Sequence, residues 1–249
     1  MRKLLEVCVD SLASARAAIA GGADRLELCS ALTVGGLTPY RELLRQIRAE
    51  SDIAVRCLMR PRAGDFLYIR EEIAMMAAQI RDLRQLGADG FVIGCLDKDG
   101  DLDKIAMAPL LEAAEGAGLT LHRCIDVSRD PCKTYLDAFA LGIDTVLTSG
   151  AEPNCLQGMQ TIERLLQLRD ELDGPEVLIG SGVNAKTVAV FRERLPQARA
   201  FHMSGKKDMD SEMRFRREGV PMGIPGLDEW HIAQTDPEAI RAARRGLDL

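Results

Sequence analysis

The sequence LLEVCV at residues 4–9 is followed by RLELC at residues 25–29, with a helical pattern at residues 11–21 between them. Side chains alternate between the two faces of a strand, so Glu6 and Cys8 share one face, as do Glu27 and Cys29. Two strands joined by a helical crossover are parallel and usually adjacent. We therefore predict a β-α-β unit in which the two Glu-x-Cys pairs stand side by side on the inner face of a sheet.

Acidic and thiol side chains on an inner face allow a structural and a functional interpretation. Cysteine often packs as a small apolar residue, and a buried glutamate can pair with a nearby arginine. Alternatively, the four side chains belong to a site. Both interpretations stay open at this point.

The alternation of strand and helix patterns continues along the whole chain. Strands are predicted at residues 4–9, 25–29, 54–59, 91–96, 119–124, 145–149, 177–180 and 200–204, and helices at residues 11–21, 40–50, 69–86, 103–117, 131–141, 156–172, 185–195 and 237–245. Thr38 is the predicted N-cap of the second helix. Eight such units in 249 residues predict an α/β protein with a single (β/α)8 TIM-barrel domain over residues 1–249. An open doubly wound sheet is the alternative, but the glycine-rich dinucleotide motif is missing after the first strand.

One long segment, residues 205–236 after the eighth strand, reads as an irregular loop and holds Trp230, the only tryptophan. Loops of this length in a compact domain are usually lids, binding loops or partner surfaces. The net charge of −6 and pI near 5.3 argue against nucleic-acid binding. The sequence has no apolar run long enough to cross a membrane and leaves no room for a signal peptide before the first strand. Seven cysteines without a Cys-x-x-Cys motif indicate reduced thiols in a cytoplasmic protein.

Candidate site residues gather where the predicted strands end, the place where TIM barrels carry their chemistry. The candidates for acid–base catalysis are Glu6, Glu27, Arg60, His122 and Asp126, with His122 as a general acid oriented by Asp126. The candidates for binding a substrate or anion are Arg62, Asp65, Arg123, Thr148, Ser149, Gly180, Gly182, His202 and Ser204. Loops after the seventh and eighth strands often bind phosphate in barrels, although glycines there can simply form a tight turn.

Metal-binding motifs with short spacing are missing, as are nucleotide and flavin motifs. A metal site would have to be assembled across strands. Cys8 and Cys29 side by side would suit a soft ion of low coordination number such as Cu(I). Zinc prefers four ligands in structural sites, and the sequence does not point to four.

Several motifs resemble those of the copper homeostasis protein CutC family. They are EVC at residues 6–8, GADRLELC at 22–29, GGLTP at 35–39, RPRAGDF at 60–66, LHRCID at 121–126, LTSG at 147–150 and the region from His202-x-Ser204 to MRFR at 213–216. They occur in order over most of the chain. The resemblance implies a cytoplasmic (β/α)8 barrel that forms homo-oligomers, dimers or tetramers, and binds Cu(I) through Cys8 and Cys29.

Two functions follow, and whether the protein is an enzyme stays open. In the first, the chain is a copper homeostasis protein that holds one Cu(I). In the second, it is a barrel enzyme that acts on a small anionic, possibly phosphorylated, metabolite by acid–base chemistry. Arg60, His122 and Asp126 favour the second function, because a two-thiolate copper site does not need them. Neither function involves a nucleic acid or a membrane as partner.

Overall fold

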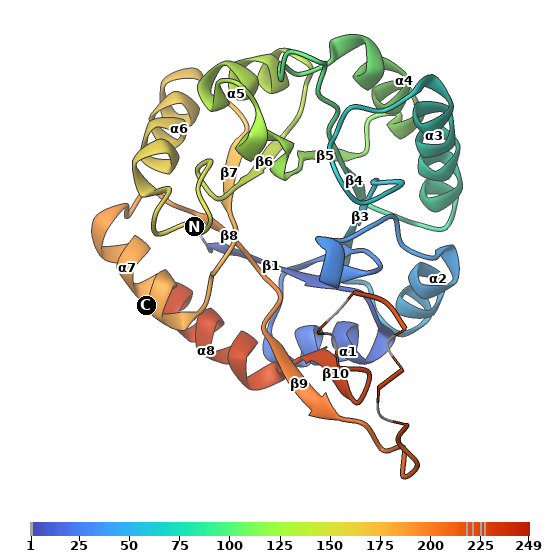
Figure 1. Ribbon diagram of the computed structural model, residues 1–249. Coiled ribbons are helices and arrows are strands. Elements are labelled where there is room, and N and C mark those ends of the chain that lie inside the picture. The colour runs from blue at the N-terminus through green and yellow to red at the C-terminus, as the bar shows by residue number, and fades with distance from the viewer. Residues whose placement is uncertain (1, 218, 221, 225, 227) are drawn as a thin grey trace.

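The computed structural model describes residues 2–217, 219–220, 222–224, 226 and 228–249. Its parallel strands are β1 (Leu4–Val9), β2 (Arg25–Leu28), β3 (Ala54–Leu58), β4 (Gly90–Ile93), β5 (Gly118–Leu121), β6 (Thr145–Thr148), β7 (Glu176–Ile179) and β8 (Ala200–Met203). They close into a barrel in this order, and helices surround it (Figure 1). The predicted α/β fold, a (β/α)8 TIM barrel, is confirmed.

The surrounding helices follow the strands in the alternating order expected for this fold. They are α1 (Leu12–Gly21), α2 (Arg41–Glu50), α3 (Arg70–Gln85), α4 (Lys104–Ala114), α5 (Pro131–Ala140), α6 (Met159–Leu172), α7 (Ala185–Arg194) and α8 (Pro237–Asp248). Two short 3-10 helices, η1 (Leu32–Val34) and η2 (Arg123–Val127), lie in the loops after β2 and β5. None of the helices in the described part of the chain combines the length and apolar character needed to cross a bilayer.

The alternation along β1 divides the core into an outer and an inner part. Leu5, Val7 and Val9 are fully buried in the main apolar cluster, which fills the space between the barrel and its helices. Glu6 and Cys8 point the other way, into the barrel, as the sequence predicts, and both are buried. The barrel interior therefore contains charged groups, which need partners there because burying an unpaired charge is costly.

The register between neighbouring strands differs from the predicted side-by-side arrangement. Glu6 aligns with Arg25 and Cys8 with Glu27, so the two Glu-x-Cys pairs are offset by two residues. Strands in a closed barrel are staggered, which shifts equivalent positions of adjacent strands along the axis. On the other side of β1, Glu6 aligns with His202 of β8. The stagger thus places Arg25, Glu6 and His202 in one row.

Two local predictions are wrong at the ends of elements. The N-cap of α2 is Tyr40 rather than Thr38, because the Thr38 hydroxyl donates to the Arg60 carbonyl and accepts from the Arg60 N–H. His122 does not lie in a strand: β5 ends at Leu121, and His122 is the N-cap of η2.

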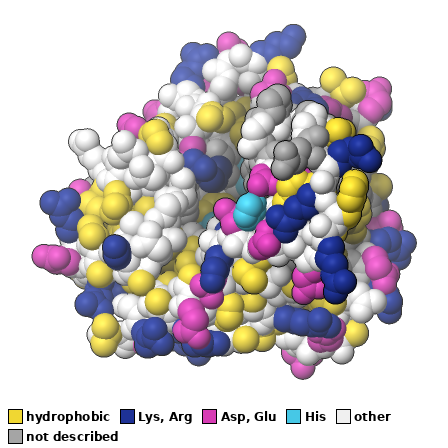
Figure 2. Space-filling model, turned by 60° about the horizontal axis from the view of Figure 1, so that its bottom comes forward, with side chains coloured by type: hydrophobic (Ala, Val, Ile, Leu, Met, Phe, Trp, Pro, Cys, Tyr) yellow, Lys and Arg dark blue, Asp and Glu magenta, His cyan; other side chains and the backbone are white. Residues whose placement is uncertain are grey.

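The segment predicted as an irregular loop contains a β-hairpin. Strands β9 (Lys206–Asp210) and β10 (His231–Thr235) pair antiparallel in a separate two-stranded sheet. The hairpin projects from the barrel beside α1 (Figure 1), and the Thr235 N–H donates to the Ser14 hydroxyl at 3.2 Å. Residues 218, 221, 225 and 227 of the predicted loop lie outside the described residues. On the face drawn in Figure 2, basic and acidic side chains are interspersed.

Candidate functional site

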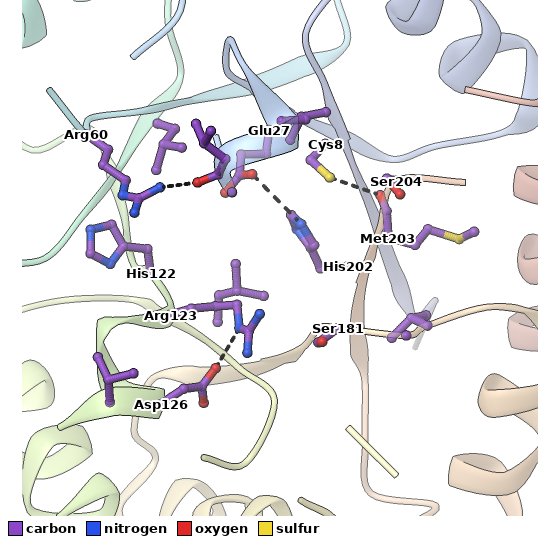
Figure 3. A pocket seen from close by; sticks show the side chains of 18 of the residues that line it. Cys8, Glu27, Arg60, His122, Arg123, Asp126, Ser181, His202, Met203 and Ser204 are labelled. Atoms are coloured by element: carbon purple, nitrogen blue, oxygen red, sulfur yellow. Dashed lines mark hydrogen bonds and ion pairs between the residues drawn. The ribbon is translucent and has the colours of Figure 1, made fainter. Parts of the chain in front are cut away.

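A cavity of about 500 Å³ opens at the carboxyl ends of the barrel strands. Its polar lining comes from β1, β2, β8 and the loops after β3, β5 and β7, as Figure 3 shows. Of the residues predicted from the sequence, those that line the cavity are Cys8, Glu27, Arg60, His122, Arg123, Asp126, Gly182, His202 and Ser204. The structure therefore gathers residues from both predicted groups, acid–base and binding, into one pocket.

His202 on one side of the pocket belongs to a buried row of charged side chains, Arg25, Glu6 and His202. The Arg25 Nε donates to Glu6 Oε2 at 2.5 Å, and His202 Nδ1 lies 2.8 Å from Glu6 Oε1. Burial alone would raise the pKa of Glu6, but the charges of Arg25 and His202 outweigh it and lower the pKa to about 2. An ionised carboxylate only accepts hydrogen bonds, so His202 Nδ1 carries a hydrogen that it donates to Glu6, and Nε2 is the ring nitrogen that is free of this contact.

That free nitrogen belongs to a cluster of three possible metal ligands. The Cys8 sulfur, a Glu27 carboxylate oxygen and a His202 ring nitrogen all lie within 4.8 Å of one another. His202 Nε2 is 3.9 Å from Glu27 Oε2, and the Cys8 thiol donates to the Met203 carbonyl at 3.7 Å. Each of the three side chains is buried but borders the cavity. A ligand entering the pocket would therefore meet a thiol, an imidazole and a carboxyl group together.

The same cluster shifts the protonation of its members. Burial raises the pKa of Glu27 to about 7, although the charge of His202 opposes this. Burial would lower the pKa of His202, but Cys8 and Glu27 outweigh it and raise the pKa well above its ordinary value. A ligand that needs a neutral imidazole must therefore displace a proton from His202.

Cys29, predicted to stand beside Cys8, lies outside this cluster. The register places Glu27 opposite Cys8, and the Cys29 thiol donates to the Val9 carbonyl at 3.4 Å. Cys29 packs in a small apolar cluster with Leu58 and Val92 inside the barrel. Burial, followed by the charge of Glu27, raises the pKa of the Cys29 thiol far above its usual range. Cys29 is thus a packed thiol rather than a thiolate facing the pocket.

His122 does not have the properties of the predicted general acid. Its Nδ1 accepts the Cys124 N–H at 3.2 Å, and burial together with the charge of Arg60 lowers its pKa to about 3. The ring is therefore neutral near pH 7 and has no acidic proton to give. Asp126 does not orient it either, because the Asp126 carboxylate accepts hydrogen bonds from Thr148, Ser149, Ala151 and Arg123.

The remaining predicted residues support loops. Thr148 and Ser149 bind Asp126 and so fix the loop after β6 to η2. Arg62 pairs with Asp65 and with Glu72, outside the lining of the cavity. The Gly180 N–H donates to the Thr148 carbonyl, and a Cβ at Gly180 would come within 2.7 Å of the Leu147 Cδ1, so a larger residue there would have to displace this buried side chain.

Arg25 and Phe66 are two residues of the site and its support that the sequence analysis does not select. Arg25 was not among the candidates, although it shares the inward-facing phase of Glu27 in RLELC. Phe66 lines the cavity, and its ring lies 4.7 Å from that of His122. Phe66 ends the RPRAGDF motif, but no periodicity in a loop shows which way an aromatic ring points.

The buried neutral state of His122 makes stability depend on pH. Its pKa is about 3 in the folded chain against an ordinary 6.5, so the unfolded chain binds more protons between these values. The free energy of unfolding should therefore fall as the pH drops below 6.5, by up to about 1.4 kcal/mol per pH unit. Urea unfolding of wild type and His122→Asn from pH 7 to pH 4 measures this, since asparagine can still cap η2 but does not titrate. Equal slopes for the two proteins would contradict the assignment.

Fold and site together define a class of protein: a (β/α)8 barrel with a pocket at the carboxyl ends of its strands, where a buried cysteine, glutamate and histidine lie together. Comparison with known proteins gives the family. The model of the CutC family matches residues 3–207, and the chain belongs to this family.

Relatives from distant organisms agree with this membership. The chain is 38% identical to a CutC family protein of Pasteurella multocida over 245 residues, covering 98% of both chains. It is also 38% identical to the human copper homeostasis protein cutC homolog over 240 residues, covering 96% of this chain and 86% of the human one. A solved structure of CutC from Streptococcus agalactiae superposes with a TM-score of 0.75 at 26% identity, over 81% of this chain and 98% of that one. The chain is thus a member of a family whose relatives are named for copper homeostasis.

Proposed function

We propose that the chain binds Cu(I) as its cargo at the mouth of the barrel, through the Cys8 sulfur and the free Nε2 of His202. Cu(I) prefers soft ligands and accepts few of them, and thiolate and imidazole are both suitable. The observation that carries the proposal is the bond between His202 Nδ1 and Glu6, which leaves Nε2 as the nitrogen near Cys8 and Glu27. The name of the human relative supports copper as the ion.

The surroundings of His202 support the assignment. Histidines that bind metals usually donate their other ring N–H to a carboxylate, which fixes the orientation of the ring and strengthens it as a ligand. Glu6 provides this carboxylate, and Arg25 in turn holds Glu6 at 2.5 Å. His202 replaces Cys29 of the predicted two-thiol site in this proposal, because Cys29 packs among apolar side chains and lies outside the lining of the cavity.

The proposed cellular setting follows from the same chemistry. Cu(I) and a reactive thiol both persist in a reducing compartment, and the seven cysteines are all free, which supports the cytoplasm. Assembly into a dimer or tetramer stays a prediction of the family resemblance.

Because the cluster of Cys8, Glu27 and His202 includes a carboxyl group, Zn²⁺ is a second ion that it could bind. Cysteine, histidine and glutamate together would also suit Zn²⁺ in an open three-ligand site, whereas Cu(I) does not need the hard carboxylate oxygen. We expect Glu27→Gln not to lower the Cu(I) affinity, and His202→Ala to lower it by more than the roughly 10- to 100-fold typical of an outer-shell loss.

Anaerobic titrations of Cu(I) against a competing chelator, and of Zn²⁺ in parallel, measure both effects. If Glu27→Gln loses as much Cu(I) affinity as His202→Ala, or if wild type binds Zn²⁺ more tightly than Cu(I), the proposal is wrong. Unfolding curves of the two variants without metal serve as the control for folding.

A further inference from the structure

Arg60 differs from the other buried arginines in what it pairs with. Arg56, Arg169 and Arg244 each bond to a carboxylate, at 2.7–2.8 Å. The Arg60 guanidinium, on a side chain buried at 8% exposure, bonds only to the backbone carbonyls of Val34, Gly36 and Gly64. None of the carboxylates in the described ranges pairs with it, and its Nε has no hydrogen-bond partner there. Its positive charge is therefore buried without a counter-charge.

The charged Arg60 side chain lies in the wall of the pocket. Arg60 lines the cavity across from Cys8 and His202 (Figure 3). Its Cζ lies over the ring of Phe66, 5.3 Å from the ring centroid. The ring of His122 also lies against Phe66, with 4.7 Å between the ring centroids, and His122 is neutral, since its pKa is lowered to about 3, so it does not alter the charge of this end. A buried charge without a partner is costly, which makes this end of the cavity a binding place for an anion.

The charges that line the rest of the pocket limit the charge of that anion. Arg123 pairs with Asp126 at 2.7 Å, so the charges of these two groups balance each other. At this end of the cavity the single charge of Arg60 is left, and the Asp126 carboxylate would repel a second negative charge on a ligand. A monoanion therefore fits better than a doubly charged phosphate.

The rest of the lining indicates the size and the apolar character of the ligand. Apolar side chains border the same cavity, namely Leu32, Val34, Leu58, Phe66, Val127, Leu147, Val183 and Met203. A volume of about 500 Å³ is in the range of pockets for small organic molecules and far exceeds what one metal ion needs.

We propose that the pocket also binds a small organic monocarboxylate, with its carboxylate at Arg60 and its apolar body against Phe66 and the aliphatic wall. This binding does not depend on copper. The chain would thus hold an ion and a small organic acid in neighbouring parts of one pocket.

The test compares benzoate with benzamide, which has the same shape but no charge, on the copper-free protein. Isothermal titration should show benzoate binding to wild type about 10-fold or more tightly than benzamide, the effect of one charge-assisted contact. Arg60→Gln should remove this difference, and Arg60→Lys, which keeps the charge, should retain it. Arg62→Gln is the matched control, because Arg62 is two residues away but pairs with Asp65 and Glu72 outside the lining.

Three results would overturn the proposal: equal affinity of wild type for benzoate and benzamide, an Arg62→Gln effect as large as that of Arg60→Gln, or inorganic phosphate binding more tightly than benzoate. The Cu(I) affinity of Arg60→Gln is the control for folding. If it is unchanged, the variant is folded, and the result for benzoate can be judged independently of the proposed copper site. If Arg60→Gln does not fold, comparing the affinities of benzoate and benzamide for wild type and for Arg60→Lys still tests the proposal.

Discussion

Replacing Cys8 by serine is expected to abolish high-affinity Cu(I) binding, while the same change at Cys29 is expected to leave it unchanged. Cys8 supplies the only thiol in the cluster with Glu27 and His202 in the described part of the chain. Serine removes the soft sulfur but keeps nearly the same shape, so the loss should exceed the roughly 10- to 100-fold typical of an outer-shell substitution. The measurement is an anaerobic chelator competition on both variants.

Cys29→Ser is the matched control for this prediction, because both cysteines follow a glutamate in the inward-facing phase of neighbouring strands. Cys29 packs against Leu58 and Val92 and lies outside the lining of the cavity, so it offers no thiolate to the pocket. If Cys29→Ser loses binding as completely as Cys8→Ser, the ion is held by two thiolates, and the ligand set proposed above is wrong.

Replacing Glu6 by alanine is expected to cause the largest loss of stability. Glu6 is fully buried and is the bonding partner of both Arg25 and His202. Its loss leaves two cationic groups inside the barrel without their carboxylate, which typically costs about 3–5 kcal/mol. Urea unfolding at pH 7 measures the change in the free energy of unfolding.

Glu50→Ala is the control for this substitution, since Glu50 also pairs with an arginine, Arg16, but on the exposed surface. Exposed ion pairs contribute little because water and salt screen them. We expect Glu50→Ala to have a small effect and Glu6→Gln, which keeps hydrogen-bonding atoms in place, to fall between the two. A Glu6→Ala protein as stable as Glu50→Ala would show that the buried row of charges does not support the barrel.

The fold could be predicted from the sequence because the barrel repeats one local pattern. The alternation in LLEVCV and RLELC indicates which residues face the barrel interior, and the structure confirms the inward orientation of Glu6 and Cys8. The approximate strand positions were sufficient to gather Glu27, Arg60 and His202 at the carboxyl ends of the strands.

The details of the site depend on long-range geometry that local patterns do not contain. The stagger of a closed barrel decides that Cys8 aligns with Glu27 and Glu6 with His202, and so it decides which pairs can share a ligand. Similarly, LHRCID has the apolar alternation of a strand, but the chain turns into η2 after Leu121, which removes His122 from its predicted role. The β9–β10 pairing joins residues 21 to 29 positions apart across a segment rich in glycine and proline, which contains no Asn-Gly or Asp-Gly hairpin turn signal.

The most direct test of the proposed copper site is X-ray absorption spectroscopy of the chain loaded with one equivalent of Cu(I) under anaerobic conditions. The extended fine structure reports the kinds of atom bound to the metal. The proposed site predicts one sulfur and one imidazole nitrogen, with the nitrogen signal lost in His202→Ala. Two sulfur atoms and no imidazole would contradict it and would assign the ion to Cys8 and Cys29.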